Sequence, residues 1–222
     1  MKDSTTSTAA RIAAPHGIAA EKELAAWLEG NFAGNDFSLR KGRVCIVSCG
    51  VSTYTWLVKS GNLFGTMRDE RGDKELAYSF FHAGQILYSM QSDISVELHA
   101  LNDAVLVQYP TEPIHAATRK DAHLCRLFAE HFHARFQTTL NRYRQAALIS
   151  SEERLYQLES ELSTIEKIDP DAVDDSTLGL FLGMHRVSVN KIRKKLRIAP
   201  PPHRKTEVVA PILHACGNDR VG

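Results

Sequence analysis

The residues with the clearest chemical capacity lie near the C-terminus, on one side of a short periodic segment. Residues 183–205 hold eight Lys or Arg and no Asp or Glu, whereas residues 166–176 hold five acids and one lysine. Val189, Ile192 and Leu196 are spaced i, i+3, i+7, which predicts a helix with one buried stripe. The candidate DNA-contacting residues on and beside its other face are His185, Arg186, Ser188, Asn190, Lys191, Lys194, Lys195 and Arg197. Such a helix suits the major groove of DNA, and the alternative is an ordinary solvated basic helix.

A second short helix is predicted directly before this one. Leu178, Phe181 and Leu182 are spaced i, i+3, i+4 and form one apolar face. Gly183 follows, and a glycine accepts the positive φ of a sharp turn. Gly179 would let the two helices approach closely. The pattern of residues 174–196 therefore predicts a helix-turn-helix.

The region before these helices has the period of β-strands. Alternating or β-rich segments occupy residues 44–48, 54–58, 63–67, 76–81, 96–101 and 104–109. Gly61 interrupts the run, and the polar turn at residues 69–73 predicts a hairpin. A second hairpin is predicted at Asn102 and Asp103. Short strands at this spacing indicate a small antiparallel sandwich or barrel-like roll.

Helices are predicted on both sides of the strands. Residues 1–20 read as a mobile tail, and residues 21–31 as a short helix. Thr118 and Asp121 resemble a capping box that opens a helix of about 30 residues. Its apolar residues lie four apart, at Leu124, Phe128, Phe132, Phe136 and Leu140. This stripe predicts either a subunit interface between two such helices or a cover for the roll.

A further capped helix leads into the helix-turn-helix. Ser150 and Glu153 form the cap, and Asp169-Pro170 ends the segment. Its apolar residues are Leu155, Leu158, Leu162 and Ile165. We therefore expect a tail (1–20), a β-roll sensor domain (21–115), a connector helix (116–149) and a DNA-binding domain (150–222).

The bulk properties exclude several classes. The 222 residues carry a formal net charge of +1, with no apolar run near the roughly 18 residues of a membrane span. The first twenty residues lack an apolar signal core, so we expect no secretion and no membrane contact. Four scattered cysteines suit unpaired thiols in the cytoplasm.

This order of segments resembles the CRP/FNR family of bacterial transcription regulators over roughly residues 41–198. The likeness rests on the glycine-punctuated strands of residues 55–87, the long helix after Tyr109, and the sequence LGMHRVSVNKIRKKL. The last is similar to the family's L-G-x-[ST]-R-x-[ST]-V-x-[RK] pattern. The resemblance implies an α+β fold with an N-terminal antiparallel β-roll (a double-stranded β-helix), a long dimerisation helix and a C-terminal helix-turn-helix domain. It also implies a homodimer through residues 118–147, an inverted-repeat operator in double-stranded DNA, and RNA polymerase as a further candidate partner.

The family's site residues carry over in part. The base-reading arginine corresponds to Arg186 and a later basic contact to Lys191, while Lys194, Lys195 and Arg197 are interpreted as phosphate contacts. The acidic residue that often follows the arginine is Val187 here, so the recognised sequence should differ.

Two departures from the family affect the expected function. Where relatives that bind cyclic AMP have Gly-Glu and Arg-Ser pairs, this chain has Tyr88-Ser89 and Ile94-Ser95, so we expect no cyclic AMP binding and leave the effector unidentified. The wing that normally follows the recognition helix is replaced by a proline-rich segment at 199–202, which predicts a reduced wing. His203, Arg204 and Lys205 are candidate replacements for its DNA backbone contacts.

The cysteines and histidines are the candidate residues for redox or metal-dependent functions. Cys45 and Cys49 read as packed thiols or, alternatively, a redox sensor, and no cysteine precedes them to hold an iron–sulfur cluster. Histidines His82 and His99 lie in the strand region without a second ligand at metal-ligand spacing, so we expect no metal, no cofactor and no enzyme activity. The alternatives are a β-roll that binds a ligand or protein without DNA binding, and a cupin-like metal enzyme.

Overall fold

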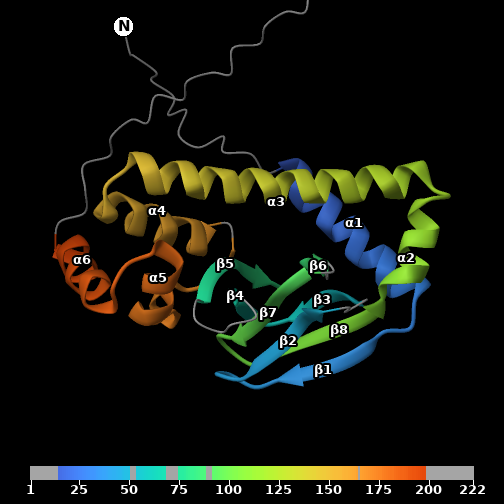
Figure 1. The fold of residues 1–222 in the computed structure, drawn as a ribbon, viewed down its shortest axis with the longest axis horizontal. Helices are drawn as coiled ribbons and strands as arrows, with labels where there is room; N and C mark the ends of the chain where they lie inside the picture. The colour runs from blue at the N-terminus through green and yellow to red at the C-terminus, as the bar shows by residue number, and fades with distance from the viewer. Residues whose placement is uncertain (1–14, 51–53, 69–74, 89–91, 165, 199–222) are drawn as a thin grey trace, which may run out of the picture.

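The computed structural model describes residues 15–50, 54–68, 75–88, 92–164 and 166–198. Over these residues the chain is α+β, with two antiparallel sheets and six α-helices (Figure 1). The strands are β1 (Asn35–Leu39), β2 (Val44–Gly50), β3 (Tyr54–Ser60), β4 (Asn62–Arg68), β5 (Glu75–His82), β6 (Ile86–Tyr88), β7 (Ser92–Ala100) and β8 (Ala104–Pro110). The helices are α1 (Pro15–Asn31), α2 (Thr111–Thr118), α3 (Ala122–Leu148), α4 (Ser151–Thr164), α5 (Asp175–Leu182) and α6 (Arg186–Ile198).

The predicted antiparallel roll is confirmed as two four-stranded sheets. One has the order β1-β8-β3-β6 and the other β2-β7-β4-β5. Alternating residues of both sheets meet between them in a core that includes Trp56, Val58, Leu63, Leu98 and Leu106, all buried. We call these two sheets the roll.

The two predicted hairpins have different outcomes. Strands β4 and β5 pair as expected, although their turn at 69–73 lies outside the described residues. The prediction of a hairpin at Asn102-Asp103 is wrong, because β7 pairs with β2 and β4 while β8 pairs with β1 and β3. The chain changes sheet there, and it also changes sheet at Gly61. The two crossings are tied by a hydrogen bond from the Asn62 backbone N–H to Asn102 Oδ1 of 2.7 Å.

The first helix is longer than predicted. It begins at Pro15 rather than near residue 21, so the segment read as a tail is partly helical, and residues 1–14 lie outside the description. Leu24 and Leu28 are fully buried and pack with Leu124 and Phe128 of α3. The first residues of this helix, PHGIAA, hold only one large apolar side chain and give no apolar stripe from which its beginning could be predicted.

The predicted capping box at the start of the long helix is also wrong. Residues 111–118 form the separate helix α2, in which the Thr118 hydroxyl donates to the His115 carbonyl. Asp121 caps α3 instead, since its Oδ1 accepts from the backbone N–H groups of His123 and Leu124 at 2.9 and 3.2 Å. A threonine and an aspartate three residues apart fit both a cap by Thr118 and a cap by Asp121. The short turn between α2 and α3 places Asp121, not Thr118, at the start of α3.

The C-terminal helices fold back beneath α3 and meet the roll at β5 (Figure 1). The predicted cap of α4 is confirmed by a hydrogen bond from the Glu153 backbone N–H to Ser150 Oγ of 3.3 Å. Buried side chains of α4, α5, α6 and β5 form one core, which includes Leu155, Leu158, Leu162, Leu178, Val189 and Phe80. None of the described helices combines the length and apolarity that crossing a membrane requires.

Candidate nucleic-acid interface

Helix α5 is fixed at its start by an aspartate. Asp174 Oδ1 accepts from the backbone N–H groups of Ser176 (2.8 Å) and Thr177 (2.9 Å), and Oδ2 accepts from the Thr177 hydroxyl (2.9 Å). Burial alone would raise the pKa of Asp174, but the hydrogen bonds from Thr177 and Ser176 outweigh it and hold the pKa below its ordinary value. The carboxylate is therefore already engaged in capping the helix.

The turn between α5 and α6 requires both glycines that the sequence singled out. Gly183 has φ 65° and ψ 38°, in the left-handed region that ends the helix. A Cβ added at Gly179 would lie 2.5 Å from the carbonyl oxygen of Met184, so only glycine permits this close approach. Arg154 of α4 supports the same turn, because its Nη1 donates to the Leu182 carbonyl at 3.1 Å.

The inner face of α6 is apolar, as predicted. Val189 is fully buried, and Ile192 and Leu196 are partly buried against the same core as Leu155 and Leu178. The spacing i, i+3, i+7 places these three on one side of a helix. The orientation of α6 about its own axis is therefore set by this stripe.

Arg193 locks α6 in place, a role that we did not predict. Its side chain is 11% exposed, and its guanidinium donates to Glu159 (2.7 Å) and Asp175 (2.9 Å). It also donates to the backbone carbonyls of Pro170 (2.8 Å) and Val173 (3.2 Å). Burial alone would lower the pKa of Arg193, but Asp175 and Glu159 outweigh it and raise the pKa. Its place four residues after Val189, at the edge of the apolar stripe, was the signal that it points inward.

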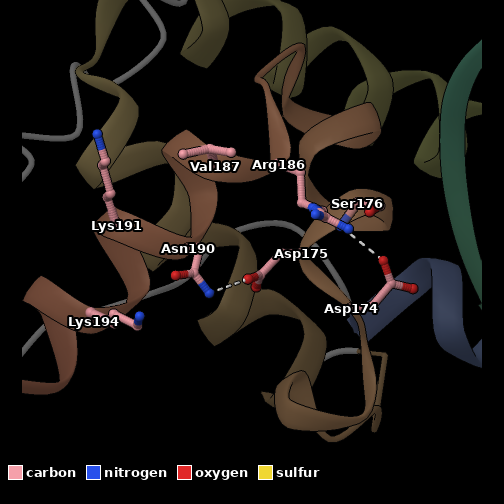
Figure 2. Close-up of a pocket in the computed structure, with 8 residues that line it drawn as sticks. All are labelled: Asp174, Asp175, Ser176, Arg186, Val187, Asn190, Lys191 and Lys194. Carbon is pink, nitrogen blue, oxygen red and sulfur yellow. Dashed lines mark hydrogen bonds between the residues drawn. The ribbon is translucent and has the colours of Figure 1, made fainter.

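The outer face of α6 presents free positive charge. Arg186, Lys191 and Lys194 are exposed, and their side chains have no hydrogen bond or ion pair with the described part of the chain. Together with Val187 and Asn190 they line a depression shared with the first residues of α5 (Figure 2). The carboxylate in this depression nearest to α6 is Asp175, which Asn190 and Arg193 already engage at 2.7 and 2.9 Å.

The remaining predicted contact residues differ in their availability. Ser188 is exposed on the flank of α6. His185 precedes the helix and caps it, since its Nδ1 accepts from the Val187 backbone N–H at 3.3 Å. Asn190 donates to Asp175, Lys195 donates to Glu152 at 2.7 Å, and Arg197 pairs with Asp171. These last three side chains are thus engaged within the protein, which the sequence did not indicate.

The predicted stripe on α3 divides into two halves. Leu124 and Phe128 are buried against α1, which agrees with the cover interpretation. Phe132, Phe136 and Leu140 are 44%, 63% and 39% exposed. Tyr88 of β6 contacts this stripe through an edge-on ring contact with Phe132 at 5.5 Å. The second half of α3 therefore leaves an apolar surface that the described chain covers only in part, at Phe132.

A cluster of Glu75, Glu97 and His99 contradicts the expectation that His99 has no second metal-ligand residue beside it. His99 does have carboxylates beside it, because Glu97 lies on the same face of β7 and Glu75 lies across the sheet on β5. Glu97 is two residues before His99, a same-face spacing on a strand that could have been noticed from the sequence. Burial lowers the pKa of His99, although Glu75 and Glu97 oppose this effect.

Similarity to solved structures identifies the fold. The chain is similar to FixK2 from Bradyrhizobium japonicum at 17% identity and a TM-score of 0.62, covering 75% of this chain and 86% of that one. It is similar to a transcriptional regulator of the CRP/FNR family from Eubacterium rectale at 21% identity and a TM-score of 0.59, covering 81% and 83%. A third is TTHA1359, a CRP/FNR-family regulator from Thermus thermophilus, at 18% identity and a TM-score of 0.57, covering 74% and 86%.

No protein-family model and no curated protein sequence matches the chain. The structural matches therefore carry the assignment, and they show that the chain has the fold of CRP/FNR-family transcription regulators. The Eubacterium and Thermus proteins are described as regulators of transcription. The resemblance inferred from the sequence is confirmed at the level of the fold.

Proposed function

We propose that this protein is a sequence-specific DNA-binding transcription regulator that acts as a homodimer. The observation that carries the proposal is the division of α6 into a buried apolar face, fixed by Arg193, and an exposed face whose Arg186, Lys191 and Lys194 have no partners in the described chain. Helices α5 and α6 form the helix-turn-helix, and α6 is the helix that enters the major groove. A cytoplasmic location follows from this role, and residues 150–222 form the DNA-binding domain.

The residues of α6 have different roles in this proposal. Arg186 lies in the first turn, where the N-terminus of a recognition helix meets base edges, and we assign it a guanine. Lys191 and Lys194 lie along the same outer face and neutralise phosphates, and Ser188 is within reach of a phosphate or base edge. Lys195 and Arg197 contribute less than the sequence suggested, because contact with DNA would have to break their pairs with Glu152 and Asp171.

The second half of α3 is the proposed dimer interface. Phe132, Phe136 and Leu140 would pack against the same residues of a second copy, giving a two-fold interface. Two recognition helices related by this symmetry would read half-sites about 34 Å apart, as an inverted repeat. Whether the bound dimer activates or represses depends on contacts with RNA polymerase and on the position of the operator.

The proposed regulator does not use cyclic AMP. Tyr88, which stands at one of the positions that such relatives use, stacks its ring on His115 and contacts Phe128 edge-on. Only residues 89–91 separate β6 from β7, which leaves little chain for a phosphate-binding segment. Isothermal titration with cyclic AMP should give no heat of binding, and micromolar binding would overturn this part of the proposal.

Two measurements test the DNA-binding proposal. Genome-wide footprinting of the tagged protein should recover one inverted-repeat sequence. On variants of that operator, Arg186→Ala should lose about 1–3 kcal/mol at a single base position, which the variant no longer distinguishes. Lys194→Ala should weaken all operators alike and reduce the salt slope by about one, whereas Lys195→Ala should change it less. An equal loss on every operator for Arg186→Ala would remove the base contact from the proposal.

The dimer is tested separately through α3. Phe136→Glu places a carboxylate in the proposed interface and should convert the dimer to a monomer in light scattering, with a loss of DNA affinity. Phe37→Glu is the control, since Phe37 is 41% exposed on β1, a strand on the opposite side of the molecule from α3 (Figure 1). If Phe136→Glu remains dimeric, the interface lies elsewhere.

A further inference from the structure

The outer face of the β2-β7-β4-β5 sheet carries a cluster that the DNA-binding proposal does not use. His99 Nε2 lies 3.6 Å from Glu75 Oε1 and 3.8 Å from Glu97 Oε2. One ligand atom from each residue can be chosen so that all three lie within 4.8 Å of one another. The three side chains come from β5 and β7, on either side of β4, and all are partly buried.

We propose that Glu75, Glu97 and His99 form a binding site for a divalent transition-metal ion of the zinc type. Two carboxylate oxygens and an imidazole nitrogen are ligands that Zn²⁺ accepts. A tetrahedral ion with bonds of about 2.0–2.2 Å separates its ligand atoms by about 3.3–3.6 Å. The two separations from His99 are within a few tenths of an ångström of this range. The two carboxylate oxygens lie within 4.8 Å of each other and would have to close further around the ion to complete three coordination positions. A water or a further protein oxygen would complete the fourth.

The strands hold the histidine in a defined orientation. The ring of His99 stacks on Phe64 with centroids 4.5 Å apart and planes 14° from parallel. The fully buried Thr66 lies beside it, with its hydroxyl 2.9 Å from His99 Nε2. Metal binding would exchange this hydrogen bond, which uses the same ring nitrogen, for a metal bond. Preorganisation of this kind lowers the entropic cost of binding.

Arg68 is the competing cation at this position. Its Nη2 lies 3.6 Å from Glu75 and 3.8 Å from Glu97, which is ion-pair distance without a hydrogen bond. Its Nε is buried and has no hydrogen-bond partner among the described residues. Arginine–carboxylate pairs are frequently joined by two parallel hydrogen bonds, which Arg68 does not make with Glu75 or Glu97. Because the side chain is 40% exposed, it can move into solvent when a metal ion takes its place.

The proposal makes opposite predictions for two variants of the full-length protein, Glu97→Gln and Arg68→Gln. Stripped of metal, the wild-type chain is titrated with zinc chloride against a chromophoric chelator, and the cobalt(II) form is followed by its visible absorption. Glu97→Gln should lose one equivalent of metal or weaken it at least about tenfold, as expected when a ligand is replaced. Arg68→Gln should tighten the same equivalent, because it removes the competing charge. His133→Ala, at an exposed histidine on α3, should leave that equivalent unchanged.

Each outcome decides the matter. Other histidines and cysteines of the chain can bind zinc. The measured quantity is therefore the difference in bound zinc equivalents between the wild type and Glu97→Gln, not the total number of equivalents bound. Thermal unfolding of each metal-free variant checks the fold, and His99→Gln replaces Glu97→Gln if the latter unfolds. Binding of the wild-type equivalent by both ligand variants, or weaker binding by Arg68→Gln, would show that the cluster is an ion-pair network without a metal.

Discussion

Two parts of this molecule place an arginine between carboxylates, and they do so with different results. In the α5–α6 unit, the Arg193 guanidinium makes hydrogen bonds of 2.7–3.4 Å to three carboxylates and two backbone carbonyls. On the outer face of the roll, Arg68 approaches two carboxylates only to 3.6 and 3.8 Å. Similar residue types thus give two different arrangements. Arg193 is fully hydrogen-bonded and fixes α6 in place, and we call Arg193 with its acceptors the clamp. Arg68 forms only longer ion pairs with Glu75 and Glu97. The two sites differ in geometry. Arg193 also donates to two backbone carbonyls, whose positions are fixed by the fold, whereas Arg68 has ion pairs with carboxylates alone among the described residues.

The largest expected effect comes from removing the saturated arginine. Arg193→Ala leaves Glu159 and Asp175 without their partner in a mostly buried position, at 24% and 18% exposure. Full burial would cost about 3–5 kcal/mol, and the remaining exposure reduces our expectation to about 2–4 kcal/mol in the free energy of unfolding. Urea unfolding followed by circular dichroism measures it. Lys194→Ala, the next residue on the outer face, should stay within about 0.5 kcal/mol. Equal losses in the two variants would show that Arg193 is no clamp.

The turn that brings Asp175 towards Arg193 gives the next largest effect. Gly183→Ala forces a side chain into φ 65°, which costs about 1–2 kcal/mol of stability. Gly30→Ala is the matched control, because no atom lies within 4 Å of a Cβ there and its φ is not in the left-handed region. At that helical position alanine should be neutral or stabilise by about 0.5–1 kcal/mol. Thermal unfolding of both variants separates backbone strain from the general effect of adding a methyl group.

The sequence was sufficient where a periodic pattern decides the structure. The stripe of Val189, Ile192 and Leu196 predicted which face of α6 is buried, and Gly183 predicted the turn. Six of the eight strands in the described residues were found for the same reason, since each alternates or is rich in β-forming residues, whereas β1 and β6 were not predicted. Arg193 could have been recognised from its place at the edge of the stripe.

Pairing between distant segments could not be read in this way. The sheet change at Asn102-Asp103 depends on which strands β7 and β8 meet, and a turn sequence does not specify this. Likewise, Lys195 and Glu152 are 43 residues apart, and only the folding of α4 against α6 brings them together. Glu75 joins His99 through the sheet order, so the metal-type cluster was missed although Glu97 was close in sequence. The features that could not be predicted are therefore contacts between residues that are far apart in the sequence.

The open cluster on the roll should be tolerant of losing its arginine. Arg68→Ala removes two ion pairs in which the arginine is 40% exposed and makes no hydrogen bond to the carboxylates, so we expect a loss of no more than about 1 kcal/mol in metal-free protein. The same urea unfolding that measures Arg193→Ala measures this variant. A loss as large as that of Arg193→Ala would show that Arg68 stabilises the fold as strongly as Arg193 does.

The smallest expected effect is the acid dependence of the clamp. Burial alone would raise the pKa of Asp175, but hydrogen bonds from Asn190 and Arg193, with the charges of Arg193 and Arg197, lower it below its ordinary value of 3.8. A carboxyl whose pKa is lower in the folded state stabilises the fold above the unfolded-state pKa, and this contribution disappears as the pH falls through the folded-state pKa. The stability difference between the wild type and Asp175→Asn should therefore be full at pH 6 and shrink below about pH 4. Urea midpoints at intervals of half a pH unit measure this difference. Lys194→Ala removes no acid and should keep the wild-type profile, whereas a constant difference between the wild type and Asp175→Asn down to pH 3 would show that the carboxylate charge does not stabilise the clamp.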